Sequence, residues 1–535
     1  MTAIERGLIA LVVVPLVGLS WQALGGGSTH SVGDAWRWLA AEPALVQSLV
    51  LTFSVALASV VASLYFARWL CYQVVWKHRN QGLQLALLSV PHAALALGVL
   101  LLLGASGVLV RLLLSGSFVA EVPDYLFPKD PLGLGVLLVL VLKESVFLAV
   151  LAVPLALRLP VSQTVRVGCE SGLSAWSSWC HLVWPRVVRW LSAPILVIFA
   201  FSLMNLEVTA VLGPDRPAFL SVRLLDWLSD PNPLIRQAGA LAMLAVLVTL
   251  TAASLIYVRA VYHRVPGWHR VYKRRRAVLW ALLWWFLGGV SVGGLISLLL
   301  WSGAGYWPVT EPWPSFNGRG WDGLGAQSAV WWETLRLGLM VACSAIVLAV
   351  LSLEWMAKRR MQRLSWVWWG LLWMPALPLS AGLLATMGWI GLSPGWTAVW
   401  LGHLLIAWPY AVVVLADTWL SRPESARRVL AESGVNSVHA LLRIWLPLHS
   451  PVIGLAFAVA FSVSASLYTQ TLLLGGGRVE TLMTELVISL HSDRRVASAA
   501  ALVNAALPMA LFFGVTFLGR RMWRHRLGMQ GGARA

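Results

Sequence analysis

Long apolar segments dominate this sequence of 535 residues. A helix needs about 20 apolar residues to cross the hydrocarbon core of a membrane, and twelve segments reach or approach that length. Because lipid offers no partner for a free backbone N–H or C=O group, such segments form helices, which satisfy these groups internally. We therefore predict an all-α, polytopic membrane protein with about 12 transmembrane helices, near residues 7–24, 46–67, 81–103, 132–156, 190–212, 237–258, 278–301, 331–353, 366–390, 397–416, 450–474 and 496–518.

The basic residues are distributed unevenly among the loops between these segments. If the N-terminus is cytoplasmic, 28 of the 40 Lys and Arg residues fall on the cytoplasmic side and ten on the other. The positive-inside rule then places both termini in the cytoplasm. The net charge of +18 has the same origin, since the basic residues stand in short runs between apolar spans. Nucleic-acid binding would need them gathered on a folded soluble surface, so no nucleic-acid partner is expected.

A short motif occurs once in each half of the chain. Arg166-Val-Gly-Cys-Glu-Ser-Gly172 and Arg428-Val-Leu-Ala-Glu-Ser-Gly434 match at five of seven positions, at an offset of 262 residues. Pro185 and Pro447 follow at the same offset, each 13 residues after its glycine. Duplication at a fixed spacing indicates repeated structural units. We predict a first repeat over residues 1–260, a basic cytoplasmic linker over 261–277 and a second repeat over 278–535.

Both copies of the motif lie in predicted cytoplasmic loops, between the fourth and fifth helix of their half. Glycine can adopt dihedrals closed to other residues, and proline is tolerated in the first turn of the next helix. The motif therefore predicts a compact turn that projects from the membrane and docks on a soluble partner. A generic helix-initiating turn would explain one copy, but two copies in equivalent loops argue against it. The candidate docking residues are Arg166, Glu170, Ser171, Gly172, Pro185, Arg428, Glu432, Ser433, Gly434 and Pro447.

These loops resemble the Gly-to-Pro half of the EAA loop in type I ABC importer permeases. The resemblance covers nearly the whole chain, which is similar to the fused two-unit branch that handles thiamine, ferric iron and related solutes. It implies two parallel six-helix permease repeats in the bacterial inner membrane, a cytoplasmic ABC ATPase in two copies, and a periplasmic solute-binding protein. The Glu-Ala-Ala of the family would fall where this chain has Arg166-Val-Gly168 and Arg428-Val-Leu430.

ATP chemistry is expected on another polypeptide. The chain has no GxxxxGK[ST] phosphate loop, which would supply the backbone cradle for nucleotide phosphates. We therefore expect a transport subunit and not an enzyme, with no catalytic residue and no cofactor of its own, and with ATP and Mg on the partner ATPase. Neither the four cysteines nor the eleven histidines show metal-ligand spacing. Accordingly, no metal site is predicted, and His92 and His403 are interpreted as core or pore-lining residues.

Four residues are candidates for a pathway or gate. Ionisable groups inside apolar spans are costly and usually face the protein interior. Lys143 and Glu144 stand inside one such span, and Glu207 stands in the fifth, with Tyr468 in the corresponding region of the second half. Neighbours at i and i+1 do not face each other on a helix, so a packed structural network is the alternative for Lys143 and Glu144.

Two other functions stay open. An ion-coupled secondary transporter would show broken helices near the midplane, often in inverted repeats. A membrane-embedded enzyme would need clustered charges on an external loop, but loop 302–330 has only Glu311, Arg319 and Asp322. The segments 220–229 and 481–490 are expected either to form a lip that receives a binding protein or to seal the bundle as interfacial helices.

Overall fold

The computed structural model of the chain describes residues 3–26, 29–79, 82–116, 122, 125, 127–263, 276–359, 361 and 366–524. It confirms the predicted class, because the described residues form α-helices and short π-helical turns, with one isolated bridge between Ala304 and Phe316. Most of the predicted basic linker, residues 264–275, lies outside the described residues. The names first half and second half are used below for residues 1–260 and 278–535.

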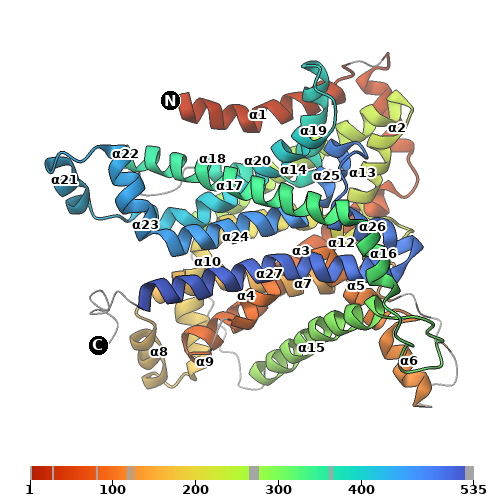
Figure 1. Ribbon diagram of the computed structural model, residues 1–535, viewed down its shortest axis with the longest axis horizontal. Helices are drawn as coiled ribbons and strands as arrows, with labels where there is room; N and C mark the ends of the chain where they lie inside the picture. The colour runs from red at the N-terminus through yellow and green to blue at the C-terminus, as the bar shows by residue number, and fades with distance from the viewer. Residues whose placement is uncertain are drawn as a thin grey trace.

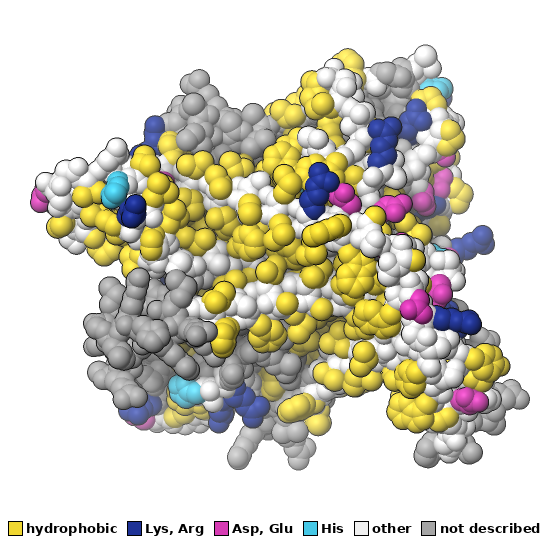
Figure 2. All heavy atoms as spheres, viewed as in Figure 1, with side chains coloured by type: hydrophobic (Ala, Val, Ile, Leu, Met, Phe, Trp, Pro, Cys, Tyr) yellow, Lys and Arg dark blue, Asp and Glu magenta, His cyan; other side chains and the backbone are white. Residues whose placement is uncertain are grey.

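Eight of the described helices are long and apolar enough to cross a membrane, or ten spans if two bent pairs each count as one. Figure 2 shows apolar side chains over the central band of the molecule and charged ones mostly toward its two ends. This distribution is the one expected of a protein whose middle faces lipid. The eight are α3 (Leu45–Val75), α5 with α6 (His92–Leu103, Val108–Ser115), α7 (Leu134–Leu157), α14 (Pro233–His263), α15 (Arg276–Ser302), α17 (Ser328–Lys358), α20 (Trp396–Leu420) and α27 (Arg494–Arg524).

Four of the predicted segments are broken in the middle. Pro91 and Pro375 cause two of the breaks, since each adopts extended backbone dihedrals and begins a new helix. A third follows Met204, where the Asn205 side chain accepts a hydrogen bond from Val208 N at 2.7 Å and caps the next helix. The fourth lies at Leu467. The resulting pairs are α4 (Gly82–Ser89) and α5, α11 (Ser192–Leu203) and α12 (Leu206–Leu212), α18 (Trp366–Trp373) and α19 (Ala376–Trp389), and α24 (Ser450–Ser466) and α25 (Tyr468–Gly475).

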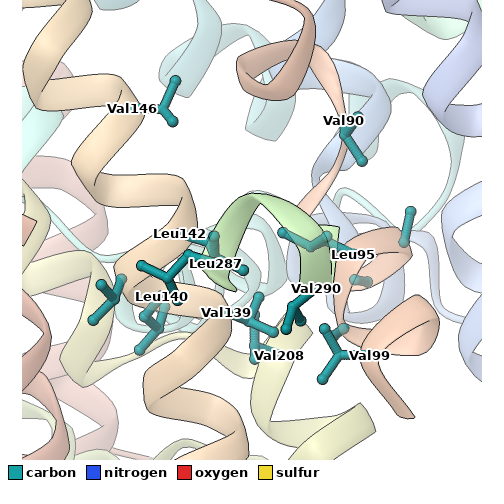
Figure 3. Close-up of a cluster of buried hydrophobic side chains, with 14 of the residues drawn as sticks. Val90, Leu95, Val99, Val139, Leu140, Leu142, Val146, Val208, Leu287 and Val290 are labelled. Carbon is teal, nitrogen blue, oxygen red and sulfur yellow. The ribbon is translucent and has the colours of Figure 1, made fainter. Parts of the chain in front are cut away.

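The first helix of each half packs on the other half. The helix α1 (Ala3–Ala23) packs mainly against α19, and α15 packs mainly against α5 and α27; Figure 1 shows α1 beside α19. Figure 3 shows Val290 of α15 close to Leu95 and Val99 of α5 and to Val208 of α12. The hydrophobic core of the first half is therefore completed by helices from the second, α15 and α27 among them.

Glycines allow both of these crossings. A Cβ atom on Gly98 would lie 2.8 Å from Gly294 O, and one on Gly382 would lie 2.0 Å from Pro15 O. On the opposite helix, a Cβ on Gly18 would lie 2.4 Å from Gly382 O. Helix backbones in membranes approach this closely only where small residues stand at the contact. Gly98 and Gly382, which stand 284 residues apart in the two halves, thus make equivalent contacts in space.

Short helices close the two ends of the molecule (Figure 1). One end contains the loops between α7 and α11 and between α20 and α24. At the other end, Leu224 of α13 and Leu486 of α26 are fully buried, so the segments near 220–229 and 481–490 pack into the bundle. The short helices at this second end are α2 (Val32–Ala41), α13 (Leu220–Ser229), α16 (Arg319–Ala326) and α26 (Leu482–Ser492).

Candidate functional site

The first motif forms a projecting loop of four short helices. Gly172 ends the first of them with φ +86°, in the left-handed region that favours glycine. Ser171 Oγ donates to Val167 O at 2.8 Å, and Leu173 N donates to Gly168 O at 3.0 Å, which closes the helix end. The helices are α8 (Val161–Glu170), α9 (Ala175–Ser178), the π-helical turn η1 (Trp179–Val183) and α10 (Trp184–Trp190), with Pro185 in the first turn of α10.

The second motif has the same construction. Gly434 has φ +68°, and Ser433 Oγ donates to Val429 O at 2.7 Å. A π-helical turn again begins seven residues after the glycine, and Pro447 again stands in the first turn of the following helix. The elements are α21 (Glu424–Glu432), α22 (Ser437–Ala440), η2 (Leu441–Trp445) and α23 (Leu446–Leu448). Sequence similarity at an offset of 262 residues is thus accompanied by similar local structure.

Both loops expose an apolar side chain at the same position of the motif. Val167 is 59% exposed and Val429 is 58% exposed. Arg166 and Arg428, one residue earlier, are also exposed, as are both Glu-Ser-Gly sequences. The two loops lie at the same end of the molecule, as α8 and α21 show in Figure 1. Apolar side chains displayed beside charged ones on a projecting loop are typical of a protein contact.

The second loop is anchored by Arg422, which sequence reasoning counted only as a topological charge. Its side chain is 3% exposed and donates to Glu354 Oε2 at 2.7 Å and to Trp419 O at 2.9 Å. The guanidinium lies over the Trp419 and Trp445 rings, 4.7 Å from each centroid. Because Trp445 belongs to η2, this cluster connects the loop to the spanning helices α17 and α20.

Replacing Arg422 by Ala is expected to loosen the second loop. The change leaves Glu354 without its cation, and losing one partner of a mostly buried pair costs about 2 kcal/mol or more. We expect a lower Tm in detergent and faster proteolysis between α21 and α23, measured by timed digestion and mass spectrometry. Arg443→Ala, at an exposed position of η2, is the matched control. Equal digestion of both variants would show that Arg422 does not hold the loop.

A cavity of about 200 Å³ lies between the halves, where the broken helices meet. Both halves line it, and all four breaks contribute residues to its wall. Most of the lining is apolar or aromatic, which is usual for a solute pocket. The polar side chains that line it include His92, Lys143, Glu144, Glu207 and Tyr410. Three of the four pathway candidates therefore line one cavity, and Tyr468 lies directly beside it.

Lys143 and Glu144 point to different partners, as the i and i+1 argument predicted. The Lys143 ammonium donates to the carbonyl oxygens of Leu87, Leu88 and Val90, at 3.1, 2.9 and 2.5 Å. These carbonyls lie at the C-terminal end of the half-helix α4, where no helical N–H group can reach them. Glu144 Oε1 instead lies 3.4 Å from His92 Nε2, at the start of α5. Both side chains are 5% exposed.

Glu207 contacts the second half of the chain. It lies in the first turn of α12, is 7% exposed, and its Oε1 accepts a hydrogen bond from Tyr468 N at 3.4 Å. Tyr468 is the first residue of α25, so the carboxylate lies at the positive ends of two half-helices, one from each half. The sequence-based pairing of Glu207 with Tyr468 thus corresponds to a contact in space.

The two isolated histidines have different roles in the structure. His403 is buried and bonded on both ring nitrogens, to Ser464 Oγ at 2.9 Å and Thr471 Oγ1 at 3.0 Å, as a core histidine would be. His92 lines the cavity, as the pore-lining interpretation expected. Tyr410 was missed, because a tyrosine in an apolar helix carries no signal of its own. Among the described residues, no group of three or more His, Cys, Asp and Glu side chains could hold a metal ion.

The chain resembles a known protein over nearly its full length. No family model matches the sequence. The chain is 29% identical over 533 residues to the inner membrane ABC transporter permease protein YnjC of Escherichia coli (strain K12), and the match covers 94% of each chain. The likeness and the apolar helices together support a multi-pass protein of the inner membrane, and a transport subunit rather than an enzyme. Over almost its whole length, this chain is thus similar to an ABC transporter permease.

Proposed function

We propose that this chain is the membrane-spanning permease subunit of an ATP-driven importer for a small solute. A periplasmic binding protein would deliver the solute to the end formed by α2, α13, α16 and α26. Two copies of a cytoplasmic ABC ATPase, which carry ATP and Mg, would dock on the loops that contain Gly172 and Gly434. The observation that carries the proposal is the pair of exposed loops of the same construction at one end of the molecule. Thiamine, ferric iron or a similar solute is what the family resemblance implies.

The path from loop to cavity is short in both halves. The helical segment that leaves each loop bends sharply into a cavity-lining helix, by 70° before α11 and by 80° before α24. Each of these helices then ends at the break before α12 or α25, the half-helices joined by Glu207 and Tyr468. A shift of a loop on its ATPase would therefore move a wall of the cavity directly. Such rigid-body rocking of packed helices suits alternating access.

One contact between the halves would have to open on the loop side of the cavity. Arg158 Nη2 lies 2.5 Å from Asp417 Oδ2, and these side chains belong to the loop-side ends of α7 and α20. They are 51% and 70% exposed, and exposed ion pairs contribute little stability. The pair can thus connect the halves at rest and break at little cost when the loops move.

An ion-coupled secondary transporter remains the second candidate, because the broken helices at the cavity suit it as well. Two observations favour the ATP-driven permease. An ion-coupled carrier has no soluble partner for the exposed loops to contact. The relative that matches the chain over nearly its full length is an ABC transporter permease. The two functions differ in their need for a separate ATPase.

The test is recovery of an ATPase with the tagged chain after mild detergent extraction, identified by mass spectrometry. We expect recovery with the wild type and a loss of at least tenfold for the double variant Val167→Asp, Val429→Asp, because a carboxylate would be desolvated in each apolar contact. Leu132→Asp, at a 70% exposed site in the loop before α7, is the control. A correctly inserted wild-type chain that never recovers an ATPase would favour the ion-coupled carrier.

A further inference from the structure

We infer that the cavity between the halves binds a small organic cation, with Glu207 as its counterion and the aromatic side chains of the wall around it. The inference names the solute class of the importer proposed above and rests on that function only for its meaning in transport. It depends on four features of the cavity: the bonds that Lys143 already makes, the free acceptor capacity of Glu207, the aromatic lining and the size.

Lys143, the one Lys or Arg side chain in the cavity lining, is already engaged. An ammonium group has three N–H donors, and Lys143 directs its own to the three carbonyls at the end of α4. An oxyanion would therefore have to take Lys143 away from these three carbonyls. The first turn of α19 also borders the cavity, but it contains Pro378, which has no N–H. The wall thus offers an anion neutral donors, such as Trp373 Nε1, which has no partner among the described residues, but no free lysine or arginine.

The Glu207 carboxylate, in contrast, can still accept further hydrogen bonds. An ionised carboxylate can accept about four hydrogen bonds. Glu207 receives one, at 3.4 Å from Tyr468 N, and no bond reaches its Oε2 from the residues that the structure describes. Glu144 has His92 beside it, whereas no described Lys, Arg or His lies within ion-pair distance of Glu207. A carboxylate inside a membrane with no cation in direct contact is costly, and a bound cation would offset that cost.

The lining selects an organic cation over a metal ion. Aromatic faces attract ammonium groups through cation–π interactions, which strengthen when water is excluded. Phe147, Phe201, Trp373, Tyr410 and Phe512 line the cavity around the carboxylates. Its volume of about 200 Å³ is below the roughly 300–1,000 Å³ of pockets for drug-sized ligands. The fitting ligand is therefore a small ammonium compound.

The first half supplies the acidic and basic side chains of the cavity. At the offset of 262 residues, Glu144 corresponds to Ile406, which also lines the cavity, and Glu207 corresponds to Thr469. The second half contributes apolar and aromatic side chains, with Ser462 and Ser466 as its other polar ones. A solute held between the halves would meet charge on one side and an aromatic wall on the other. Opening the halves would separate these two surfaces, which gives a physical route to release.

The test is equilibrium binding of radiolabelled tetramethylammonium to the purified full chain in lipid nanodiscs, without ATPase, binding protein or ATP. We expect saturable binding that choline displaces and that phosphate at equal ionic strength does not. Glu207→Gln should weaken it at least tenfold, and Tyr410→Leu several-fold. Asp226→Asn, on α13 outside the cavity lining, should leave it unchanged. Thermal unfolding of each variant verifies that the chain is folded.

Three outcomes would overturn the inference: no saturable binding of tetramethylammonium by the wild type, unchanged binding by Glu207→Gln, or saturable binding of labelled phosphate that the cation does not displace. None of them bears on recovery of an ATPase, which tests the importer itself. Cation binding without any ATPase partner would instead retain the site and overturn the importer.

Discussion

Gly98→Leu and Gly382→Leu are each expected to prevent the two halves from assembling. The Cβ atom alone would lie 2.8 Å from Gly294 O in the first case and 2.0 Å from Pro15 O in the second. Both obstacles are backbone atoms of an opposing helix, which no side-chain rotation can move. Overpacking of ordinary cores costs about 1–3 kcal/mol, and forcing two backbones apart along a crossing should cost more than about 3 kcal/mol. We expect little monodisperse protein, measured by size-exclusion chromatography of the detergent extract.

Gly289→Leu is the matched control for this experiment. Gly289 lies on α15, five residues before Gly294, and a Cβ atom there would meet nothing within 4 Å. The change adds the same leucine to the same apolar helix, and it should leave yield and elution unchanged. If Gly98→Leu were as well folded as Gly289→Leu, α5 and α15 would not cross where the structure places them. The packing of α15 on the first half would then be wrong.

The exchanged positions of α1 and α15 show where sequence reasoning stopped. Hydropathy indicates that these segments span the membrane. It carries no signal for which neighbour a helix packs against, because a buried face and a lipid-facing one are equally apolar. Gly98 and Gly382 stand in equivalent places of the two halves, but the contacts that explain them involve Gly294 and Pro15, far away along the chain.

Two of the four helix breaks could have been predicted from the sequence. Proline disfavours helix in the residue before it, so Pro91 and Pro375 could have divided their segments from the start. Nothing comparable marks Leu467, where the chain simply adopts extended dihedrals. The candidate pathway residues were recognisable because a charge inside an apolar span is costly. Arg422 was not, since arginine near a helix end is the common case in cytoplasmic loops, and only the structure shows its burial between two tryptophans.

Lys143→Met is expected to release the end of α4 and to disturb the cavity. Methionine keeps the length of the side chain but cannot donate, so the carbonyls of Leu87, Leu88 and Val90 lose a shared charged donor. Hydrogen bonds to a charged group contribute about 1.5–3 kcal/mol each, and an unmatched carboxylate charge adds to the loss. We expect a lower Tm and faster amide hydrogen exchange in α4, followed by mass spectrometry. Lys358→Met, at the exposed end of α17, should change neither.

A second substitution separates the two effects of losing Lys143. Adding Glu207→Gln to Lys143→Met removes an uncompensated negative charge while the carbonyls stay unpaired. If the charge imbalance dominates, the double variant should recover most of the lost Tm, although α4 should still exchange fast. If the carbonyls dominate, Tm should stay low. Normal exchange of α4 in Lys143→Met would contradict the capping role altogether, and it would leave Lys143 free to bind an anion in the cavity, which is the opposite of the solute class inferred here.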